Sequence, residues 1–219
     1  MDFQRAKLHL ETSILMGVDF LPIASHLDTA HCNEPASLLV QLSAKHDDTC
    51  EHCSQNNKFT QTVFGIGNPN AQLMFIGGSP SDEEDLQGIP FVGEAGNKLN
   101  EIITAMGMQR ENVYITNVLK SKLPNNRTPS TEEVAKCVPF LAAQVAIIQP
   151  DVIVALGSTA ATFLLGKAAD ITQLRGTWAT YEGIAVLPTF HPAFLLQNYT
   201  KEIRAQIWAD MQQVMAKLD

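Results

Sequence analysis

From Gln72 onward, short apolar runs alternate with longer stretches of helical periodicity. This alternation constrains the fold most, because strand–helix–strand repeats form parallel sheets with helices on both faces. Each short run is almost continuously apolar, as expected for strands covered on both sides. The sequence therefore predicts an α/β fold around four parallel strands. The expected strands are Leu73–Ile76, Val113–Thr116, Val152–Leu156 and Ile184–Leu187.

Helical stretches separate these strands, and each ends close to a glycine or a proline. The expected helices are Ala95–Met106, Ser130–Ile148, Ser158–Leu165 and a final amphipathic helix from about Lys201 to Lys217. Two further helices are expected earlier, near Gln4–Leu15 and Pro35–Lys45. Residues 1–60 are interpreted as an N-terminal appendage of helices and loops that carries a cysteine pair, and residues 61–219 as the main domain.

The chain contains four cysteines, Cys32, Cys50, Cys53 and Cys137. No basic and apolar leader precedes the first helix, so a reducing cytoplasmic setting is expected, where Cys-x-x-Cys indicates metal or redox chemistry. With Cys137, the pair supplies three thiols, and a structural zinc or an iron–sulfur cluster needs a fourth ligand. The candidates are Ser121, His46, His52 and Cys32, and the alternative is a set of unligated thiols.

Hydropathy argues against a membrane protein, and the net charge neither indicates nor excludes nucleic-acid binding. No run of about 18 apolar residues is present, so a membrane span is not expected. The formal net charge is −8, so bulk electrostatics do not indicate nucleic-acid binding. Phosphates are bound by local groups, however, and the segment 120–127 holds Lys120, Lys122 and Arg127 without an acid. This segment is the candidate phosphate contact, and an exposed loop without a ligand is the alternative.

Unusual residues follow each expected strand. Gly77, Gly78, Ser79 and Pro80 follow the first strand, Asn117 the second, Gly157-Ser158 the third and the segment 188–192 the fourth. Open α/β sheets bind ligands outside the carboxyl ends of their strands. We therefore expect these residues to meet at one edge.

Three side chains at this edge are suited to a planar base. Phe91 lies among glycines and prolines, where it is either a stacking platform or a core anchor. The Asn117 amide complements a pyrimidine edge, although asparagine is also common in turns. His191 is a candidate electrophile or acid–base group. One acid of the run 82–85 is a candidate to orient a water, and the alternative is a solvated loop.

An apolar segment with Leu195 follows His191, and it is either an exposed tip that wedges into a base stack or the start of a buried helix.

Taken together, these motifs resemble the uracil-DNA glycosylase superfamily, and most closely its family 4, the iron–sulfur type. The resemblance runs from about Cys50 to Met215. It is carried by seven segments at 67–71, 84–96, 114–118, 124–129, 137–141, 174–176 and 188–193. It implies a three-layer α/β/α sandwich around a four-stranded parallel sheet. It also implies a monomeric DNA repair enzyme that flips out uracil and hydrolyses its N-glycosidic bond.

The resemblance also implies roles. Phe91 stacks on the uracil, Asn117 reads its edge, and His191 donates to the uracil oxygen. The turn of Gly77, Gly78 and Ser79 lines the pocket. Arg175 lies in a matching segment and joins Leu195, Lys120, Lys122 and Arg127 as expected DNA contacts. Cys50, Cys53 and Cys137 match three ligands of a 4Fe-4S cluster.

Two positions depart from the family pattern. Gly78 replaces the glutamate that assists the reaction, so Ser79 and Glu84 become the candidates to hold the water or help catalysis. Ser121 replaces the remaining cluster cysteine, and a serine oxygen is a weaker ligand than a thiolate. These departures keep two alternatives open: a weak or inactive DNA-binding relative, and an enzyme for another deaminated base. An unrelated α/β protein that binds a small nucleotide is a third alternative.

Overall fold

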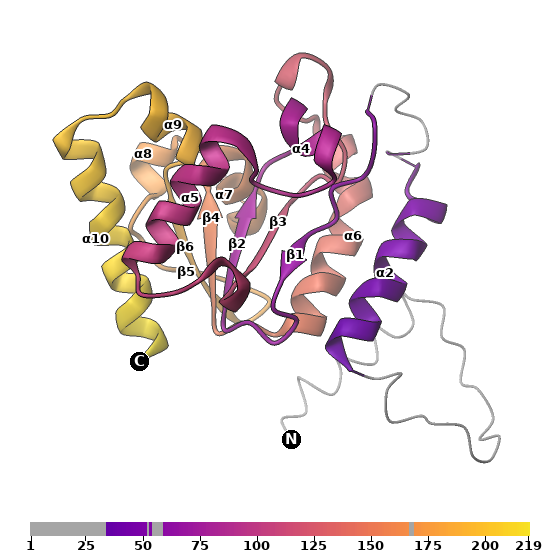
Figure 1. The fold of residues 1–219 in the computed structure, drawn as a ribbon, viewed down its shortest axis with the longest axis horizontal. Helices are drawn as coiled ribbons and strands as arrows, with labels where there is room; N and C mark the ends of the chain where they lie inside the picture. The colour runs from indigo at the N-terminus through magenta and orange to yellow at the C-terminus, as the bar shows by residue number, and fades with distance from the viewer. Residues whose placement is uncertain (1–33, 52, 54–58, 167–168) are drawn as a thin grey trace.

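The computed structural model describes residues 34–51, 53, 59–166 and 169–219, and Figure 1 shows their arrangement. The expected helix at 4–15 and the candidate ligands Cys32 and His52 lie outside the described residues. The rest form an α/β fold in which a mixed sheet is flanked by helices. No helix in these ranges is long and apolar enough to cross a membrane.

The sheet has six strands in the order β1-β3-β2-β4-β6-β5, so the prediction of four strands was incomplete. Neighbouring strands among β3, β2, β4 and β6 pair in parallel, whereas β1 and β5 pair antiparallel at the two edges. The edge strands were missed because they are only two and three residues long and carry no apolar run. The strands are β1 Ile66–Gly67, β2 Leu73–Gly77, β3 Tyr114–Asn117, β4 Val152–Leu156, β5 Ala179–Tyr181 and β6 Ile184–Thr189.

Helices cover both faces of the sheet, and alternating strand residues divide between two cores. In β2, Met74 and Ile76 belong to the core under α2, α6 and α7. Leu73 and Phe75 belong to the core under α5, α9 and α10. The α-helices are α2 Pro35–Thr49, α4 Asp82–Gln87, α5 Gly93–Ala105, α6 Thr131–Ile148, α7 Gly157–Leu165, α8 Ile171–Leu174, α9 Pro192–Gln197 and α10 Lys201–Leu218. Two short 3-10 turns are η1 Arg110–Asn112 and η2 Pro124–Asn126.

The helix α6 begins where the sequence predicts it. Ser130 accepts a hydrogen bond from the backbone N–H of Glu133, and the Glu133 side chain accepts from the Ser130 N–H. This reciprocal cap satisfies two backbone donors of the first turn. On its outer side α6 packs against α2, whose Leu39 and Leu42 belong to the same core (Figure 1). This packing holds the end of α2 beside α6, which is distant from it in the sequence.

The register of the parallel strands brings the residues that follow them to one edge of the sheet. Gly77, the last residue of β2, pairs with Asn117, the last residue of β3. Leu156 at the end of β4 pairs with Thr189 at the end of β6, two residues before His191. The carboxyl ends of the four parallel strands therefore share one edge, as the sequence predicts.

Candidate functional site

Gly77, Asn117 and Phe91 meet at the carboxyl edge of the sheet. A Cβ atom built on Gly77 would overlap the Asn117 Oδ1 atom and lie 2.7 Å from the Phe91 Cζ atom. Phe91 and Asn117 are both buried, with exposed fractions of 2% and 1%. Only glycine at position 77 lets an amide and an aromatic ring approach the same point of the backbone.

The backbone of Phe91 is held in an uncommon conformation. Its φ angle is 52°, in the left-handed region that residues other than glycine rarely adopt. Gly96 of α5 packs so closely on the Phe91 carbonyl that a Cβ at position 96 would overlap it. Such strain persists only where the surroundings enforce it, and it is common at ligand sites. The loop therefore holds the ring in one place.

Glu84 lies behind the Asn117 amide. The Asn117 Nδ2 atom donates a hydrogen bond of 3.0 Å to the Glu84 Oε2 atom, and both side chains are buried. Burial raises the pKa of Glu84 to about 7, although hydrogen bonds from Asn117 and from the Phe91 backbone oppose the rise. The ionised carboxylate only accepts hydrogen bonds, so it fixes the amide with Oδ1 turned toward Gly77 and Phe91.

His191 completes the group. Its ring centroid lies 5.4 Å from that of Phe91, at an interplanar angle of 31°. Burial lowers the pKa of His191 to about 4, so the imidazole is neutral near pH 7. The Nδ1 atom accepts a hydrogen bond of 3.2 Å from the Ala193 N–H at the start of α9. A neutral ring that accepts at Nδ1 carries its proton at Nε2, which leaves an N–H donor there.

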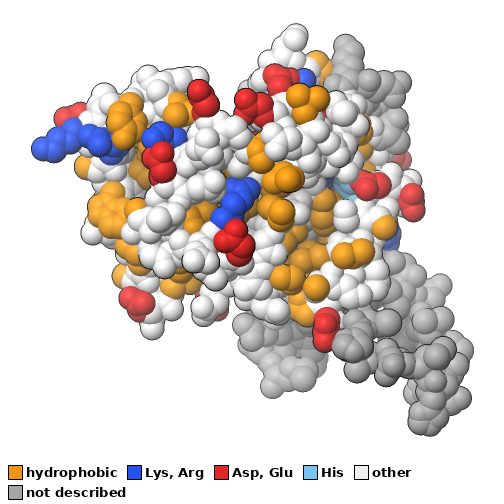
Figure 2. All heavy atoms as spheres, viewed as in Figure 1, with side chains coloured by type: hydrophobic (Ala, Val, Ile, Leu, Met, Phe, Trp, Pro, Cys, Tyr) orange, Lys and Arg blue, Asp and Glu red, His pale blue; other side chains and the backbone are white. Residues whose placement is uncertain are grey.

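Gly78 and Ser79 are half-buried in the turn after β2. The Gly78 backbone lies beside Thr159 of α7, because a Cβ at position 78 would be 2.9 Å from the Thr159 Cβ. Thr159 also lines a cleft of about 470 Å³ between α7 and the segment that leads into α6. Figure 2 shows the molecule hollowed at its top edge, with acidic side chains on both rims.

Lys120 does not lie on the surface, which corrects its expected role as a phosphate contact. The side chain is fully buried, and its Nζ donates to the Thr116 hydroxyl, the Asn117 carbonyl and the Gln144 amide oxygen at 2.6–2.7 Å. Burial lowers the pKa of Lys120 to about 7. The residue thus supports the backbone of Asn117 from within.

The other two cations of the segment are accessible but paired. Lys122 forms an ion pair with Asp82 at the start of α4. Arg127 forms a two-pronged pair with Glu133, at 2.7 and 2.5 Å. On the face drawn in Figure 2, blue and red side chains are interspersed rather than gathered into one basic patch. Any DNA phosphate must therefore compete with carboxylates for these two cations.

Arg175 and Leu195 also differ from their expected exposure. The Arg175 guanidinium donates to the Asp210 carboxylate at 2.7 and 3.2 Å and lies over the Phe190 ring. Leu195 is 5% exposed and packs in the core beside α5 and α10, so it is not a free wedge. The segment after His191 forms a short helix, α9, which turns Leu195 inward. The start of a buried helix was one of the two alternatives that the sequence left open for this segment.

We expect Arg175→Ala to lower the free energy of unfolding by about 3 kcal/mol, because Asp210 stays buried without its cation. The matched control is Arg127→Ala, which breaks an exposed pair and should cost less than about 1 kcal/mol. Urea unfolding followed by circular dichroism measures both. Equal losses in the two variants would show that the Arg175–Asp210 pair is not structural.

A second group of polar side chains lies between α2 and α6. Cys50, Cys53 and Cys137 are buried free thiols packed with Leu119 and Leu123. Hydrogen bonds from Cys137 and Cys53 lower the pKa of Cys50, and a hydrogen bond with Cys137 raises that of Cys53. The three thiols lie in one buried cluster, although Cys137 is more than 80 residues away in the chain.

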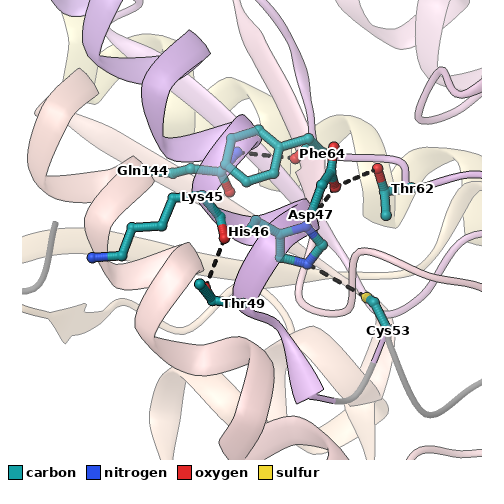
Figure 3. A network of polar contacts seen from close by, with 8 residues as sticks. All are labelled: Lys45, His46, Asp47, Thr49, Cys53, Thr62, Phe64 and Gln144. Atoms are coloured by element: carbon teal, nitrogen blue, oxygen red, sulfur yellow. Dashed lines mark hydrogen bonds and ion pairs between the residues drawn. The ribbon is translucent and has the colours of Figure 1, made fainter.

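Ser121 and His46 face the same thiols. The Ser121 hydroxyl is buried and has no hydrogen-bond partner among the described residues. The His46 Nε2 atom lies 3.4 Å from the Cys53 Sγ atom (Figure 3). An orphaned buried hydroxyl beside three thiols fits a site that receives a metal, since buried polar groups are otherwise satisfied. The donor set of sulfur, nitrogen and oxygen atoms suits zinc or iron.

The residues that support these groups could not be recognised from the sequence. Asp47 and Thr62 are hydrogen-bonded to each other beside His46, and Gln144 binds Lys120 from α6. Asp47, Thr62 and Gln144 are single polar residues without a motif. His46, by contrast, was a candidate ligand from the sequence, and it lies four residues before Cys50 near the end of α2.

Comparison with known proteins places this arrangement in a family. Residues 64–212 match the Uracil DNA glycosylase superfamily. A type-4 uracil-DNA glycosylase of Thermotoga maritima is 44% identical over 176 residues, which are 80% of this chain and 92% of that protein. A type-4 uracil-DNA glycosylase of Archaeoglobus fulgidus is 38% identical over 174 residues, 76% and 86% of the two chains.

A type-5 uracil-DNA glycosylase of Pyrobaculum aerophilum is 28% identical over 149 residues, 60% of this chain and 66% of that protein. The higher identity to the type-4 proteins agrees with the resemblance seen in the sequence. The chain belongs to the uracil-DNA glycosylase superfamily, and its similarity is greater to the type-4 members named here than to the type-5 member.

Proposed function

We propose that this protein hydrolyses the N-glycosidic bond of uracil in DNA and leaves an abasic site. The observation that carries the proposal is the convergence of Phe91, Asn117 and His191 beside the bare backbone of Gly77. A base inside a duplex cannot reach such a buried group, so the nucleotide is flipped out of the stack first. One chain supplies all these groups, so a monomer suffices.

Asn117 distinguishes uracil from cytosine. With one amide N–H bound to Glu84, the Asn117 Oδ1 atom accepts from the uracil N3–H, and the second N–H donates to the uracil O4. Cytosine presents an acceptor and a donor at these two positions, so both contacts become repulsive. A site with fixed buried polar groups rejects such a mismatch strongly. The aromatic face of Phe91 stacks on the ring of the base.

His191 stabilises the departing base. Cleavage of the glycosidic bond develops positive charge on the sugar and negative charge on uracil. The Nε2–H of the neutral imidazole donates to the uracil oxygen that gains this charge, and its stabilising effect grows toward the transition state. Glu84 is a positioning residue in this scheme, since its carboxylate already binds the Asn117 amide and the Phe91 backbone.

Ser79 is the proposed holder of the attacking water. Position 78 is glycine, which cannot supply the carboxylate of the family pattern, and Ser79 is the next side chain along the turn. A hydroxyl orients a water but abstracts no proton at neutral pH, so we expect turnover slower than that of members with the glutamate. Ser79 is half-buried, so the residue is not enclosed by the core.

Contacts with the DNA backbone are assigned to Lys122 and Arg127. Both are paired with carboxylates on the protein, and a phosphate exchanges with those partners at little cost because both pairs are exposed. The affinity for DNA should then fall with salt, with a slope that reflects about two phosphates.

We also propose that Cys50, Cys53 and Cys137 hold a 4Fe-4S cluster. Three buried thiols from two distant segments lie in one cluster, and the neighbouring chain position 121 supplies a buried hydroxyl. When bound, the cluster cross-links the end of α2 to α6 and supplies no redox step to a hydrolytic reaction. Its role is therefore structural.

The pH profile follows from Glu84. Because burial raises its pKa to about 7, we expect the single-turnover rate to rise between pH 6 and pH 8 as the carboxylate ionises and fixes Asn117. Glu84→Gln keeps an acceptor for the Asn117 N–H but does not titrate, so its profile should lose this rise, whereas buried Lys120 titrates in both proteins. If the variant keeps the rise of the unaltered protein, Glu84 is not its source.

Release of free uracil from a uracil-containing oligonucleotide tests the function. Single strands, U·G duplexes and a hypoxanthine-containing strand are compared, and the abasic product is detected by alkaline cleavage. We expect uracil release and none from an otherwise identical thymine strand. Salt-dependent binding without release even after long incubation would instead support the inactive DNA-binding relative.

A further inference from the structure

We propose that His46, and not Ser121, supplies the fourth ligand to the metal centre held by Cys50, Cys53 and Cys137. This proposal rests on the proposed function only in taking the centre to be an iron–sulfur cluster.

His46 is placed as a ligand by the helix that carries it. It lies in the last turn of α2, four residues before Cys50, and the Cys50 N–H donates to the His46 carbonyl at 2.9 Å. Cys50 is the C-cap residue of α2, so it follows His46 by one turn of the chain at the end of the helix. The ligand atoms of His46, Cys50 and Cys53 all lie within 4.8 Å of one another.

The His46 nitrogen that faces away from the thiols, Nδ1, is hydrogen-bonded to a carboxylate, as is typical of a metal-binding histidine. The His46 Nδ1 atom lies 3.0 Å from the Asp47 Oδ1 atom, and the Thr62 hydroxyl donates to that same oxygen at 2.8 Å (Figure 3). A carboxylate only accepts hydrogen bonds, so Nδ1 carries the proton and Nε2 presents its lone pair to the thiols. A carboxylate in this position orients a ligating histidine and increases its basicity.

The ring is also fixed by packing. His46 is fully buried. Its centroid lies 4.8 Å from that of Phe140 in an edge-on contact and 5.7 Å from that of Phe64. These rings exclude water from the imidazole, so Nε2 has no solvent partner and faces the Cys53 Sγ atom at 3.4 Å. A metal bound to Nε2 satisfies this nitrogen.

Ser121 is the weaker donor of the two. Its hydroxyl must lose a proton to bind iron as an anion, and no described carboxylate or imidazole is hydrogen-bonded to it. The side chain beside it, Lys120, donates elsewhere and accepts nothing. Imidazole binds iron and zinc as a neutral ligand and needs no such step. His46 therefore takes the place of the cysteine ligand that is missing at position 121.

The test uses the full-length protein, purified without oxygen, and the variants His46→Ala, His46→Cys, Ser121→Ala and His52→Ala. Iron and sulfide are measured per chain, and pulsed electron paramagnetic resonance of the reduced centre detects coupling to a nitrogen ligand. We expect nitrogen coupling in the unaltered protein and in Ser121→Ala. His46→Cys should keep about four irons per chain without nitrogen coupling, and His46→Ala should fall to about three or fewer.

A compensating double variant guards against simple misfolding. His46→Ala combined with Ser121→Cys restores a fourth thiolate, so we expect about four irons per chain and no nitrogen coupling. Coupling that persists in His46→Ala or disappears in His52→Ala would overturn the proposal. So would iron loss in Ser121→Ala with full iron in His46→Ala.

X-ray absorption separates this inference from the proposed function. A zinc centre with one nitrogen ligand that disappears in His46→Cys would uphold the role of His46 and contradict the iron–sulfur cluster. A centre with only sulfur or oxygen ligands would contradict the role of His46, whatever the metal. Uracil release is assayed separately, so each failure is recognised by its own measurement.

Discussion

Replacing Asn117 by alanine is expected to slow uracil release by about 10²–10³-fold, the loss typical of removing a fixed polar group that acts on the transition state. The amide lies at the end of β3, bound to Glu84 and in contact with Gly77. Its loss removes both contacts to the base edge and leaves the Glu84 carboxyl buried without this partner. Single-turnover rates on one uracil-containing oligonucleotide measure the effect.

Asn112→Ala provides the matched control. This asparagine lies just before the opposite end of β3, where its side chain accepts a hydrogen bond from the Gln109 N–H on the surface. Its substitution should change the rate by less than about twofold, since the residue is remote from the site. A similar loss of rate in both variants, or full activity in Asn117→Ala, would remove the assigned role of Asn117.

His191→Ala is expected to lower the rate by about 10²-fold, and His191→Gln should retain part of the activity because its amide also has N–H donors. Since burial holds the pKa of His191 near 4, the imidazole is already neutral at pH 6. The ratio of the unaltered rate to the His191→Ala rate should therefore be constant between pH 6 and pH 8. A ratio that rises steeply toward low pH would identify a protonated imidazole and contradict the neutral donor.

The common edge of Gly77, Asn117 and His191 could be predicted from the sequence, because parallel strands place their carboxyl ends side by side. Asn117 and Gly77 end neighbouring strands, and their pairing in register follows from the apolar runs before them. The edge strands β1 and β5 could not be predicted in this way. Two or three residues without an apolar run carry no periodic signal, and their pairing depends on strands that the rest of the chain forms.

Exposure was the property that the sequence predicted least well. Lys120 occurs in a run with Lys122, and charge alone suggests two surface cations. The buried acceptors that receive Lys120 come from β3 and from Gln144 in the middle of α6, so they are visible only after folding. Arg175 is similar, because Asp210 lies 35 residues later on α10. Long-range polar pairs of this kind have no local pattern.

A crystal structure of the protein with bound uracil tests the role of Phe91, Asn117 and His191 most directly. We predict that the uracil ring lies against Phe91, with its N3 and O4 atoms within hydrogen-bond distance of the Asn117 amide and an oxygen facing the His191 Nε2 atom. Uracil bound instead in the cleft lined by Thr159 and Phe163, with the Phe91 ring free of contact, would contradict the account.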